Sequence, residues 1–373
     1  MVKDVIKLGD VATYINGYAF KPEDRGEVGL PIIRIQDLTG NAYDLGFYDG
    51  EYPEKIEIND GDVLISWSAS LGVYVWNRGR ALLNQHIFKV VFDKVDIDKN
   101  YFVYAVRQKL VEMGMKTHGA TMKHIVKKDF DATLIPYPSL IEQAEIATNL
   151  NKVSRVIEAR KQELQLLDDL IKARFVELFG EYYMNHINEK QLDEICDFID
   201  YRGKTPEKSE SGIPLITAKN VKDNRFSIEP QEFIPEENYD DVMTRGIPRV
   251  NDVLFTTEAP LGNVCRIPDV YERFCVGQRL ITMQPHTDVI NSEYLEHALA
   301  SAEFQEKMWQ KSSGSTVKGI RSKLLVLLTI PVPPIELQNQ FRDFVHQVDK
   351  SKFININIIP EGGFYNGDKF YIS

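Results

Sequence analysis

Ile135-Pro136-Tyr137-Pro138 stands between a series of short apolar runs and a long helical pattern, and Ile330-Pro331-Val332-Pro333 stands at the same kind of boundary later in the chain. Each stretch follows a similar motif, Gly119-Ala120-Thr121-Met122-Lys123 in the first case and Gly314-Ser315-Thr316-Val317-Lys318 in the second. Further matches occur upstream in the same order: Leu8-Gly9-Asp10-Val11 with Leu192-Asp193-Glu194-Ile195, Leu30-Pro31-Ile32-Ile33 with Ile213-Pro214-Leu215-Ile216, Gly61-Asp62-Val63-Leu64-Ile65 with Asn251-Asp252-Val253-Leu254-Phe255, and Gln85 with Gln278. Chance does not readily produce matches in unbroken order, so the sequence predicts a duplicated domain.

Each copy mixes strand and helix patterns. Residues 63–67 and 88–92 are short apolar runs bounded by Gly, Asn and Asp, which is typical of strands. Residues 100–109 and 292–300 have apolar side chains every three or four positions, which predicts helices. We therefore predict an α+β fold with two similar α+β domains.

A long helical pattern follows the first copy, from residue 141 to residue 179. Its inward positions alternate in steps of four and three: Ile146, Leu150, Val153, Ile157, Arg160, Leu164, Leu167, Ile171, Arg174 and Leu178. This spacing is a heptad seam, and an apolar seam of that length needs a partner helix. Gly180 is predicted to end the helix at a left-handed cap.

The second copy begins a similar helix, with Phe341, Val345 and Val348 at matching places. Pro360, Gly362 and Gly363 then disfavour a helix, and the alternating Ile-Asn residues from 354 onward favour a strand or a frayed tail. The second helix is thus expected to be truncated. The predicted domains are residues 1–140, a spacer helix at 141–180, a second domain at 181–335, a second helix start at 336–353 and an atypical tail at 354–373.

Composition narrows the class of protein. The chain has 373 residues, enough for two or three domains, and 44 Lys and Arg against 55 Asp and Glu, a net charge of −11. That balance argues against a uniformly basic, nucleic-acid-coating surface. No run approaches the roughly 20 apolar residues of a membrane span, and no apolar signal region follows Met1. Three cysteines without metal-ligand spacing fit reduced thiols, so we expect a cytoplasmic protein with no membrane association.

Catalytic motifs are missing from the sequence. Gly203-Lys204-Thr205 suggests a phosphate-binding loop, but Phe198 occupies the place of the first glycine and Pro206 the place where a helix begins. His118 and His124 are the closest histidine pair, and no cysteine or third histidine joins them. We therefore predict a non-catalytic protein with no cofactor and no metal.

This layout resembles the specificity subunit of type I restriction-modification systems. The resemblance rests on a Gly-x-Thr-x-Lys motif before an Ile-Pro-x-Pro strand, and on a helix start bearing Gln143 or Gln338. It covers about residue 5 to residue 353 and fails only in the last stretch. The Ile-Pro-x-Pro junction with a long helix, present twice, is its most specific part.

The resemblance implies a non-catalytic subunit whose two target-recognition domains each read one half of a bipartite site in double-stranded DNA. It also implies that the long helices form an antiparallel coiled coil, which sets the half-site spacing and docks methyltransferase subunits, two of them expected. Restriction subunits would join through the complex. Because the second helix looks incomplete, a homodimer is an additional expectation.

Candidate DNA-binding residues follow from the chemistry of readout, since Arg, Lys, Asn and Gln make paired hydrogen bonds to base edges. The matched loops offer candidates for base contact: Arg34, Gln36, Gln85 and His86 in the first copy, and Lys219, Asn220, Gln278 and Arg279 in the second. The shared motifs offer candidates for phosphate contact: Thr121, Lys123, Thr316, Lys318, Phe20, Lys21, Arg202 and Lys204. The opposing interpretation is that some of these residues cap turns or pair with Asp37 and Asp62.

A partner is expected on the seam of the long helix, at Leu150, Val153, Ile157, Leu164, Leu167, Ile171 and Leu178. Two alternatives stay open at this level. One is a recognition subunit whose partner fuses nuclease and methyltransferase, and the other is a duplicated protein–protein scaffold. A stand-alone enzyme is disfavoured, because no catalytic constellation is present.

Overall fold

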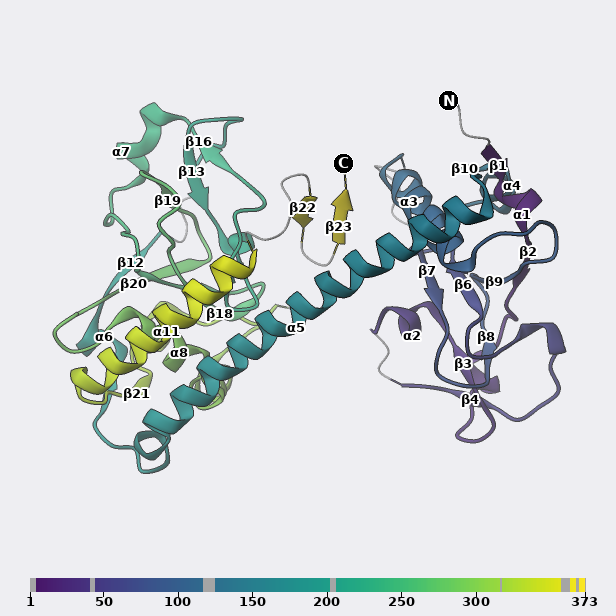
Figure 1. The fold of residues 1–373 in the computed structure, drawn as a ribbon. Helices are drawn as coiled ribbons and strands as arrows, with labels where there is room; N and C mark the ends of the chain where they lie inside the picture. The colour runs from purple at the N-terminus through teal and green to yellow at the C-terminus, as the bar shows by residue number, and fades with distance from the viewer. Residues whose placement is uncertain are drawn as a thin grey trace. The chain divides into compact units, whose positions relative to one another are not determined.

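The computed structural model describes residues 5–40, 44–116, 125–201, 206–315, 317–356, 363–366 and 369–372 (Figure 1). The chain divides into two compact units, Met1–Glu158 and Ala159–Ser373. Helix α5 (Leu140–Met184) contributes its first part to one unit and its second part to the other. Each unit is therefore described by itself.

The first unit contains two four-stranded sheets and a short strand pair. One sheet is antiparallel, in the order β2 (Thr13–Asn16), β9 (Ile87–Val91), β6 (Val63–Ser66) and β7 (Gly72–Val75). The other has the order β4 (Phe47–Tyr48), β3 (Leu30–Ile33), β8 (Ala81–Leu83) and β5 (Glu57–Ile58). Strand β1 (Val5–Lys7) pairs with β10 (Leu134–Pro136). The α-helices before α5 are α1 (Leu8–Val11), α2 (Ile35–Thr39), α3 (Lys99–Lys116) and α4 (Lys127–Ala132).

The second unit repeats this arrangement. Its antiparallel sheet has the order β12 (Cys196–Asp200), β20 (Leu280–Pro285), β17 (Val253–Thr257) and β18 (Leu261–Arg266). A smaller sheet has the order β16 (Phe233–Ile234), β13 (Ile213–Ile216) and β19 (Cys275–Val276). Two separate strand pairs complete the unit: β11 (Glu189–Gln191) with β21 (Thr329–Pro331), and β14 (Val221–Lys222) with β15 (Arg225–Phe226). The helices are α6 (Leu192–Ile195), α7 (Tyr239–Val242), α8 (Ser292–Ala300), α9 (Ala302–Lys311), α10 (Ser322–Leu325) and α11 (Ile335–Ile356).

Strand pairing confirms the α+β fold and the internal duplication. In both units a four-stranded antiparallel sheet is accompanied by a parallel pair, Ile32 opposite Leu82 in the first and Leu215 opposite Cys275 in the second. The copies differ at the next helix. Helix α3 is continuous, whereas the second copy breaks into α8 and α9 at Ser301, whose side chain caps α9 by accepting from the Phe304 backbone N–H.

Helix α5 ends later than predicted, which corrects the expectation for Gly180. The helix continues through Gly180 to Met184. A glycine in a helix costs about 1 kcal/mol, but Phe179 is fully buried beside it and Tyr183 packs against the same core. Burial of two aromatic side chains outweighs that cost.

Helix α11 also ends later than predicted, since Ile354 to Ile356 are helical rather than extended. The tail then contains the hairpin of β22 (Gly363–Asn366) and β23 (Lys369–Ile372). Helix α11 has 22 residues against 45 in α5. Within the described residues, no helix combines the length and apolar character needed to cross a membrane.

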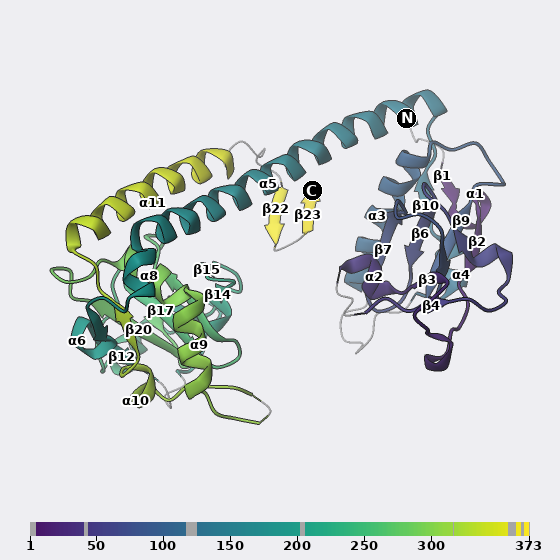
Figure 2. The same ribbon diagram turned by 90° about the horizontal axis from the view of Figure 1, so that it is seen from below.

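In the second unit α11 runs antiparallel to the end of α5 (Figure 2). The Lys352 Nζ lies 2.9 Å from Asp168, and Phe341 packs against both Phe175 and Phe179, so positions later in one helix meet positions earlier in the other. The heptad pattern predicts that Arg174 and Leu178 face the partner helix, but Phe175 and Phe179 make the contact with α11. The apolar face of α5 is wider than a heptad seam because it packs against the domain as well as against α11.

Candidate nucleic-acid interface

The start of each long helix is held by the same buried hydrogen bonds. Gln143 is fully buried; its Nε2 donates to the Pro138 carbonyl at 2.8 Å and its Oε1 accepts from the Asp98 N–H at 2.9 Å. Gln338 does the same with the Pro333 carbonyl at 2.8 Å and the Asn291 N–H at 3.0 Å. The glutamine that marked each helix start in the sequence is therefore a structural residue joining helix to domain.

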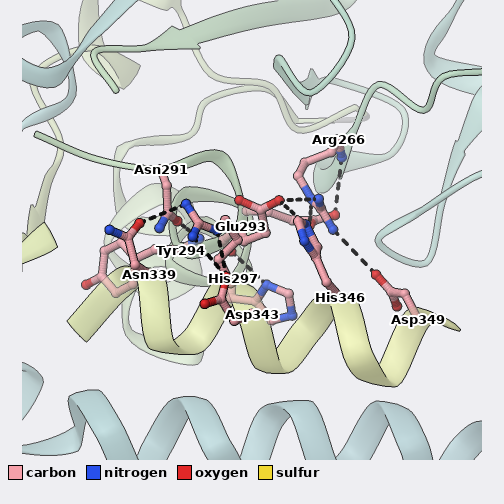
Figure 3. Close-up of polar contacts among 11 residues, drawn as sticks. Arg266, Asn291, Glu293, Tyr294, His297, Asn339, Asp343, His346 and Asp349 are labelled. Atoms are coloured by element: carbon pink, nitrogen blue, oxygen red, sulfur yellow. Dashed lines mark hydrogen bonds and ion pairs between the residues drawn. The ribbon is translucent and has the colours of Figure 1, made fainter. Parts of the chain in front are cut away.

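A charge network fastens α11 to the second unit (Figure 3). Arg266 lies 2.8 Å from Glu293 and 2.7 Å from Glu296 on α8, and 3.7 Å from Asp349 on α11. His346 reaches Glu293 from α11, with Nε2 2.8 Å from Oε1. The charges of Arg266 and Glu293 are largely buried, and such charges are tolerated only when paired. This network fixes α11 against α8 in the second unit.

His297 lies where α8 meets the two long helices. Its Nδ1–H donates to the Glu293 carbonyl at 2.9 Å, and its ring centroid lies 5.1 Å from that of Phe341 and 6.1 Å from that of Phe175. Burial lowers the pKa of His297 below its usual value, because the apolar surroundings disfavour the charged imidazolium. The imidazole is therefore held neutral in the helix interface.

Three segments meet on the surface of each unit around one loop residue. His86, between β8 and β9, and Arg279, between β19 and β20, both have φ of 71°. The His86 carbonyl accepts from the Trp67 N–H at 3.2 Å, and the Arg279 carbonyl accepts from the Thr257 N–H at 3.0 Å. Left-handed backbone is strained for residues other than glycine. Matching strain at matching places identifies this loop as a shared surface feature.

The third segment is the one that follows the Gly-x-Thr-x-Lys motif. The Ile125 N–H donates to the Trp67 carbonyl at 2.9 Å in the first unit, and the Ile320 N–H donates to the Thr257 carbonyl at 3.0 Å in the second. In the second unit these segments line a hollow of about 320 Å³ that contains Gln278 and Arg279. The structure thus brings these two predicted residues close to the segment bearing Lys318, whose side chain is exposed.

Glu258 and Arg321 also line this hollow, and sequence reasoning missed both. A weak signal was present, because Glu258 directly follows a buried strand and Arg321 lies shortly after Lys318. In the first unit Gln85 is exposed and His86 is half-buried. The predicted residues Thr121, Lys123, Arg202, Lys204 and Thr316 lie outside the described residues.

The turns after β3 and β13 form a second pair of matched loops, and several of their polar side chains bond within the loop. Asp37 accepts from the Arg34 backbone N–H at 2.8 Å, and Asn220 accepts from the Thr217 N–H at 2.9 Å. Asn220 is 3% exposed, and its amide also donates to the Ser227 carbonyl at 2.9 Å. Its polar atoms are therefore engaged within the loop, and we no longer propose Asn220 as a base-reading residue.

Arg34 is also turned inward. Its side chain is 11% exposed and pairs with Asp37 at 3.0 Å and with Asp44 at 3.5 Å. The two acidic groups raise the pKa of Arg34 against the opposing effect of burial. The neighbouring predicted residues are more accessible, since Gln36 is exposed and Lys219 is exposed with its Nζ 2.8 Å from Glu232. The exposed members of these turns stay predictions as DNA contacts.

The aromatic loop of the first unit is partly packed. Phe20 is half-buried and makes edge contacts with Tyr18 at 5.0 Å and Tyr48 at 5.2 Å between ring centroids. Lys21 is exposed, with its Nζ 3.8 Å from Glu23. The loop therefore presents an exposed cation next in sequence to a packed aromatic side chain, and an exposed cation is suited to contact with a phosphate.

The predicted partner-binding seam of α5 is unevenly covered. In the first unit Val153 is 47% exposed, while Leu150 and Ile157 are half-buried. In the second unit Ile171 is buried, and Leu164, Leu167 and Leu178 are half-buried. Other apolar side chains of the helix face outward: Leu166, Leu170 and Val176 are 68%, 47% and 66% exposed.

One cluster in the second unit has the composition of a metal site. His186, Glu189 and Glu303 offer ligand atoms within 4.8 Å of one another. Lys307 already lies among them, with its Nζ 3.1 Å from Glu189 and 2.8 Å from Glu303. Despite the opposing effect of burial, hydrogen bonds from His186, Lys307 and Thr329 hold the pKa of Glu189 at about 2. The Lys307 ammonium therefore already occupies the place between the two carboxylates that a metal ion would take.

Comparison with known proteins supplies independent evidence. The model of the type I restriction modification DNA specificity domain matches residues 3–168 and 184–361. The specificity subunit of type I restriction enzyme EcoBI from Escherichia coli is 25% identical over 92% of this chain and 78% of its own length. The MjaVIII specificity subunit from Methanocaldococcus jannaschii is 22% identical over 93% of this chain and 86% of its own length. The crystal structure of a type I S subunit from M. genitalium has a TM-score of 0.54 at 16% identity, over 95% of this chain and 91% of the other, which supports the fold.

Proposed function

The chain belongs to the type I restriction modification DNA specificity family, and we propose that its two units read the two halves of a bipartite site in double-stranded DNA. The family model matches each copy of the repeat separately. The chain is the non-catalytic specificity subunit of a type I restriction-modification system, and methylation and cleavage are carried out by other subunits.

The observation that carries this proposal is the pairing of a shared framework with different loop side chains. Gln143 and Gln338 make the same buried bonds, whereas His86 and Arg279 occupy one strained loop position with different chemistry. Two homologous units with different contact residues suit two half-sites of different sequence. An antiparallel pairing of the two long helices would give the chain pseudo-two-fold symmetry, so we expect the half-sites to have inverted polarity.

Methyltransferase and restriction subunits are the protein partners of such a chain. We assign the methyltransferase contact to the outward apolar side chains of α5, including Leu166 and Leu170, because exposed apolar side chains grouped on one helix favour a protein interface. Two methyltransferase subunits are proposed, one for each copy of the repeat. We place the complex in the cytoplasm, where the DNA of a cell without a nucleus lies.

A homodimer is the alternative partner arrangement. Helix α11 has about half the length of α5, so part of α5 is left for another helix. Sedimentation of the purified chain with and without methyltransferase subunits separates the two arrangements. If the purified chain sediments as a monomer and forms a larger complex with methyltransferase subunits, docking is supported. If the chain alone sediments as a dimer, self-association is supported.

Affinity for DNA is expected to depend on the partner. The net charge of −11 gives the chain few phosphate contacts of its own, and phosphate neutralisation dominates DNA affinity. The isolated chain should therefore bind duplex DNA weakly, and binding should strengthen when methyltransferase subunits are added. Tight, sequence-specific binding by the chain alone at physiological salt would contradict this expectation.

The decisive experiment is methylation-sensitive sequencing of a host genome with and without this chain. The expected result is a bipartite motif that is methylated only when the chain is present. A library selection with the assembled complex provides the same readout in vitro. If neither experiment yields a sequence motif, the chain serves as a protein scaffold instead of a DNA reader.

A further inference from the structure

The loop residue at the matched strained position faces different surroundings in the two units. The His86 ring lies edge-on to Trp67 with 4.9 Å between centroids, and its Nδ1 is buried without a hydrogen-bond partner among the described residues. The Arg279 side chain is instead 53% exposed. The same backbone conformation therefore presents a packed imidazole in one copy and an accessible guanidinium in the other.

One acidic residue forms an ion pair with that guanidinium. The Nε of Arg279 lies 3.2 Å from Glu258 Oε1, and Glu258 directly follows β17 and lines the same hollow. In the part of the chain that the structure describes, Arg279 forms no other ion pair. A carboxylate beside Nε lies to one side of the guanidinium and leaves its outer end accessible, where Nη1 and Nη2 carry their donors in a fixed planar arrangement.

We propose that Arg279 reads a guanine in the half-site bound by the second unit and that Glu258 is its positioning residue, an inference that rests on the proposed DNA-recognition function. Guanine presents O6 and N7 as paired acceptors in the major groove, and a guanidinium end matches both at once. Neither the family match nor the relatives' names assign this pair. In the first unit His86 lacks the fork, so its half-site has no corresponding requirement for guanine.

The surroundings of Arg279 fit a site that meets the major groove. Lys318 and Arg321 are exposed on the neighbouring segment, and Gln278 lies in the same hollow. Cations beside a base-reading residue attract the flanking phosphates and set the register of the protein on the duplex. The Arg279–Glu258 pair is also half-exposed on both sides, so it contributes little to folding and can be changed without unfolding the unit.

The test is a selection from a random duplex library by the full chain assembled with its methyltransferase subunits. The wild-type complex should enrich a bipartite motif with a guanine favoured roughly 5- to 150-fold at one position of one half-site. Arg279→Ala should remove that preference and leave every other position unchanged. Arg279→Lys should weaken the preference without removing it, since the lysine ammonium can still donate to guanine O6 and N7 but lacks the planar fork.

Glu258 is tested by the same readout. Glu258→Ala should weaken the preference at the same guanine position and at no other, whereas Glu258→Gln, which keeps an acceptor oxygen, should restore part of it. Lys318→Ala should instead lower affinity for all duplexes equally, as loss of a phosphate contact does. Arg273→Ala, which removes an arginine packed over Tyr239 3.8 Å from the ring centroid, is the control and should leave the motif unchanged.

The outcomes separate this inference from the function on which it rests. A wild-type complex that enriches no motif overturns both. A bipartite motif that is identical for the wild type and Arg279→Ala overturns the inference alone. A uniform loss of affinity in Arg279→Ala, with the motif intact, makes Arg279 a phosphate contact and overturns the inference too. Equal melting temperatures of the variants verify that each complex is folded.

Discussion

The two copies of the repeat agree closely where a long helix begins and differ in side-chain chemistry at one matched loop. At the helix start, Tyr101 donates to the Pro136 carbonyl at 2.8 Å and Tyr294 donates to the Pro331 carbonyl at 2.7 Å, beside the two equivalent glutamines. At the loop, His86 is packed on Trp67 whereas Arg279 is accessible. Buried hydrogen bonds tolerate little change, while an exposed side chain is free to differ. The fold can therefore persist while the DNA sequence read by each unit changes.

The largest expected effect comes from substitutions in the two long helices, which pack differently in the two copies. Phe341 in α11 and Ile146 in α5 lie at the same distance after Gln338 and Gln143, but Phe341 is fully buried and Ile146 is half-buried. Phe341→Ala should cost about 3–5 kcal/mol of unfolding free energy in the second unit. Ile146→Ala should cost roughly 1–2 kcal/mol, because less apolar area is removed from water. Hydrogen exchange of each unit under urea measures both, and equal costs would show that the helices pack alike.

A smaller effect tests where the copies agree. Gln338→Ala leaves the Asn291 N–H and the Pro333 and Val289 carbonyls without their partner, and Gln143→Ala leaves a similar set in the first unit. Each unpaired buried group costs about 1–3 kcal/mol. Because water can enter the space left by the shorter side chain and bond some of these groups, we expect Gln338→Ala to destabilise its unit by roughly 2–4 kcal/mol and Gln143→Ala by slightly less.

Gln347→Ala is the matched control for these glutamines, since Gln347 is exposed on α11. It should change the unfolding free energy by less than about 0.5 kcal/mol. Chemical denaturation of all three variants gives the comparison. A neutral effect of Gln338→Ala would show that the buried bonds at the junction contribute nothing.

The smallest expected effect concerns pH and is confined to the second unit. The folded-state pKa of His297 is lowered from 6.5, so the unfolded chain binds the proton first as pH falls. Stability is therefore complete above about pH 6.5 and decreases below it, by at most about 1.4 kcal/mol per pH unit for one group. The charged groups facing His297 are Glu296 and Asp349, which favour its protonation, and Arg266, which opposes it.

Melting temperatures between pH 7.5 and pH 5.5 measure this dependence. His297→Phe keeps an aromatic ring beside Phe175 and Phe341 and should remove the decrease that comes from His297. His346, which is half-exposed beside Glu293, is changed to Gln in a second variant that removes this neighbouring ion pair. If His297→Phe retains the full pH dependence, the decrease arises elsewhere in the unit.

Sequence patterns predicted the framework well because they report local periodicity and repetition. The duplication, the strands at residues 63–67 and 88–92, and the start of both long helices all follow from apolar spacing and matched motifs. Helix ends were predicted less well. Gly180 lies inside α5 because tertiary burial of Phe179 opposes the local preference of glycine, and spacing alone carries no record of that burial.

The candidate site was likewise predicted only in part. Residue types on matched loops selected Gln278 and Arg279, which the structure brings into one hollow, but they also selected Arg34 and Asn220. Those two side chains face inward, because Asp37, Asp44 and a ring of carbonyls surround them. Pairing with Asp37 was the alternative that the sequence offered, and it is confirmed for Arg34, whereas Asp44 lies beyond the reach of a turn pattern.

By itself, the order of residues determined that this protein is two copies of one α+β unit, each followed by a helix, because repetition and hydrophobic periodicity are properties of the chain. Only the tertiary structure decided which polar residues face outward. Accessibility depends on partners brought together by folding. Asp37 and Asp44 engage a largely buried Arg34, whereas Arg279 beside Glu258 keeps 53% of its side chain exposed and therefore keeps donors that DNA can reach.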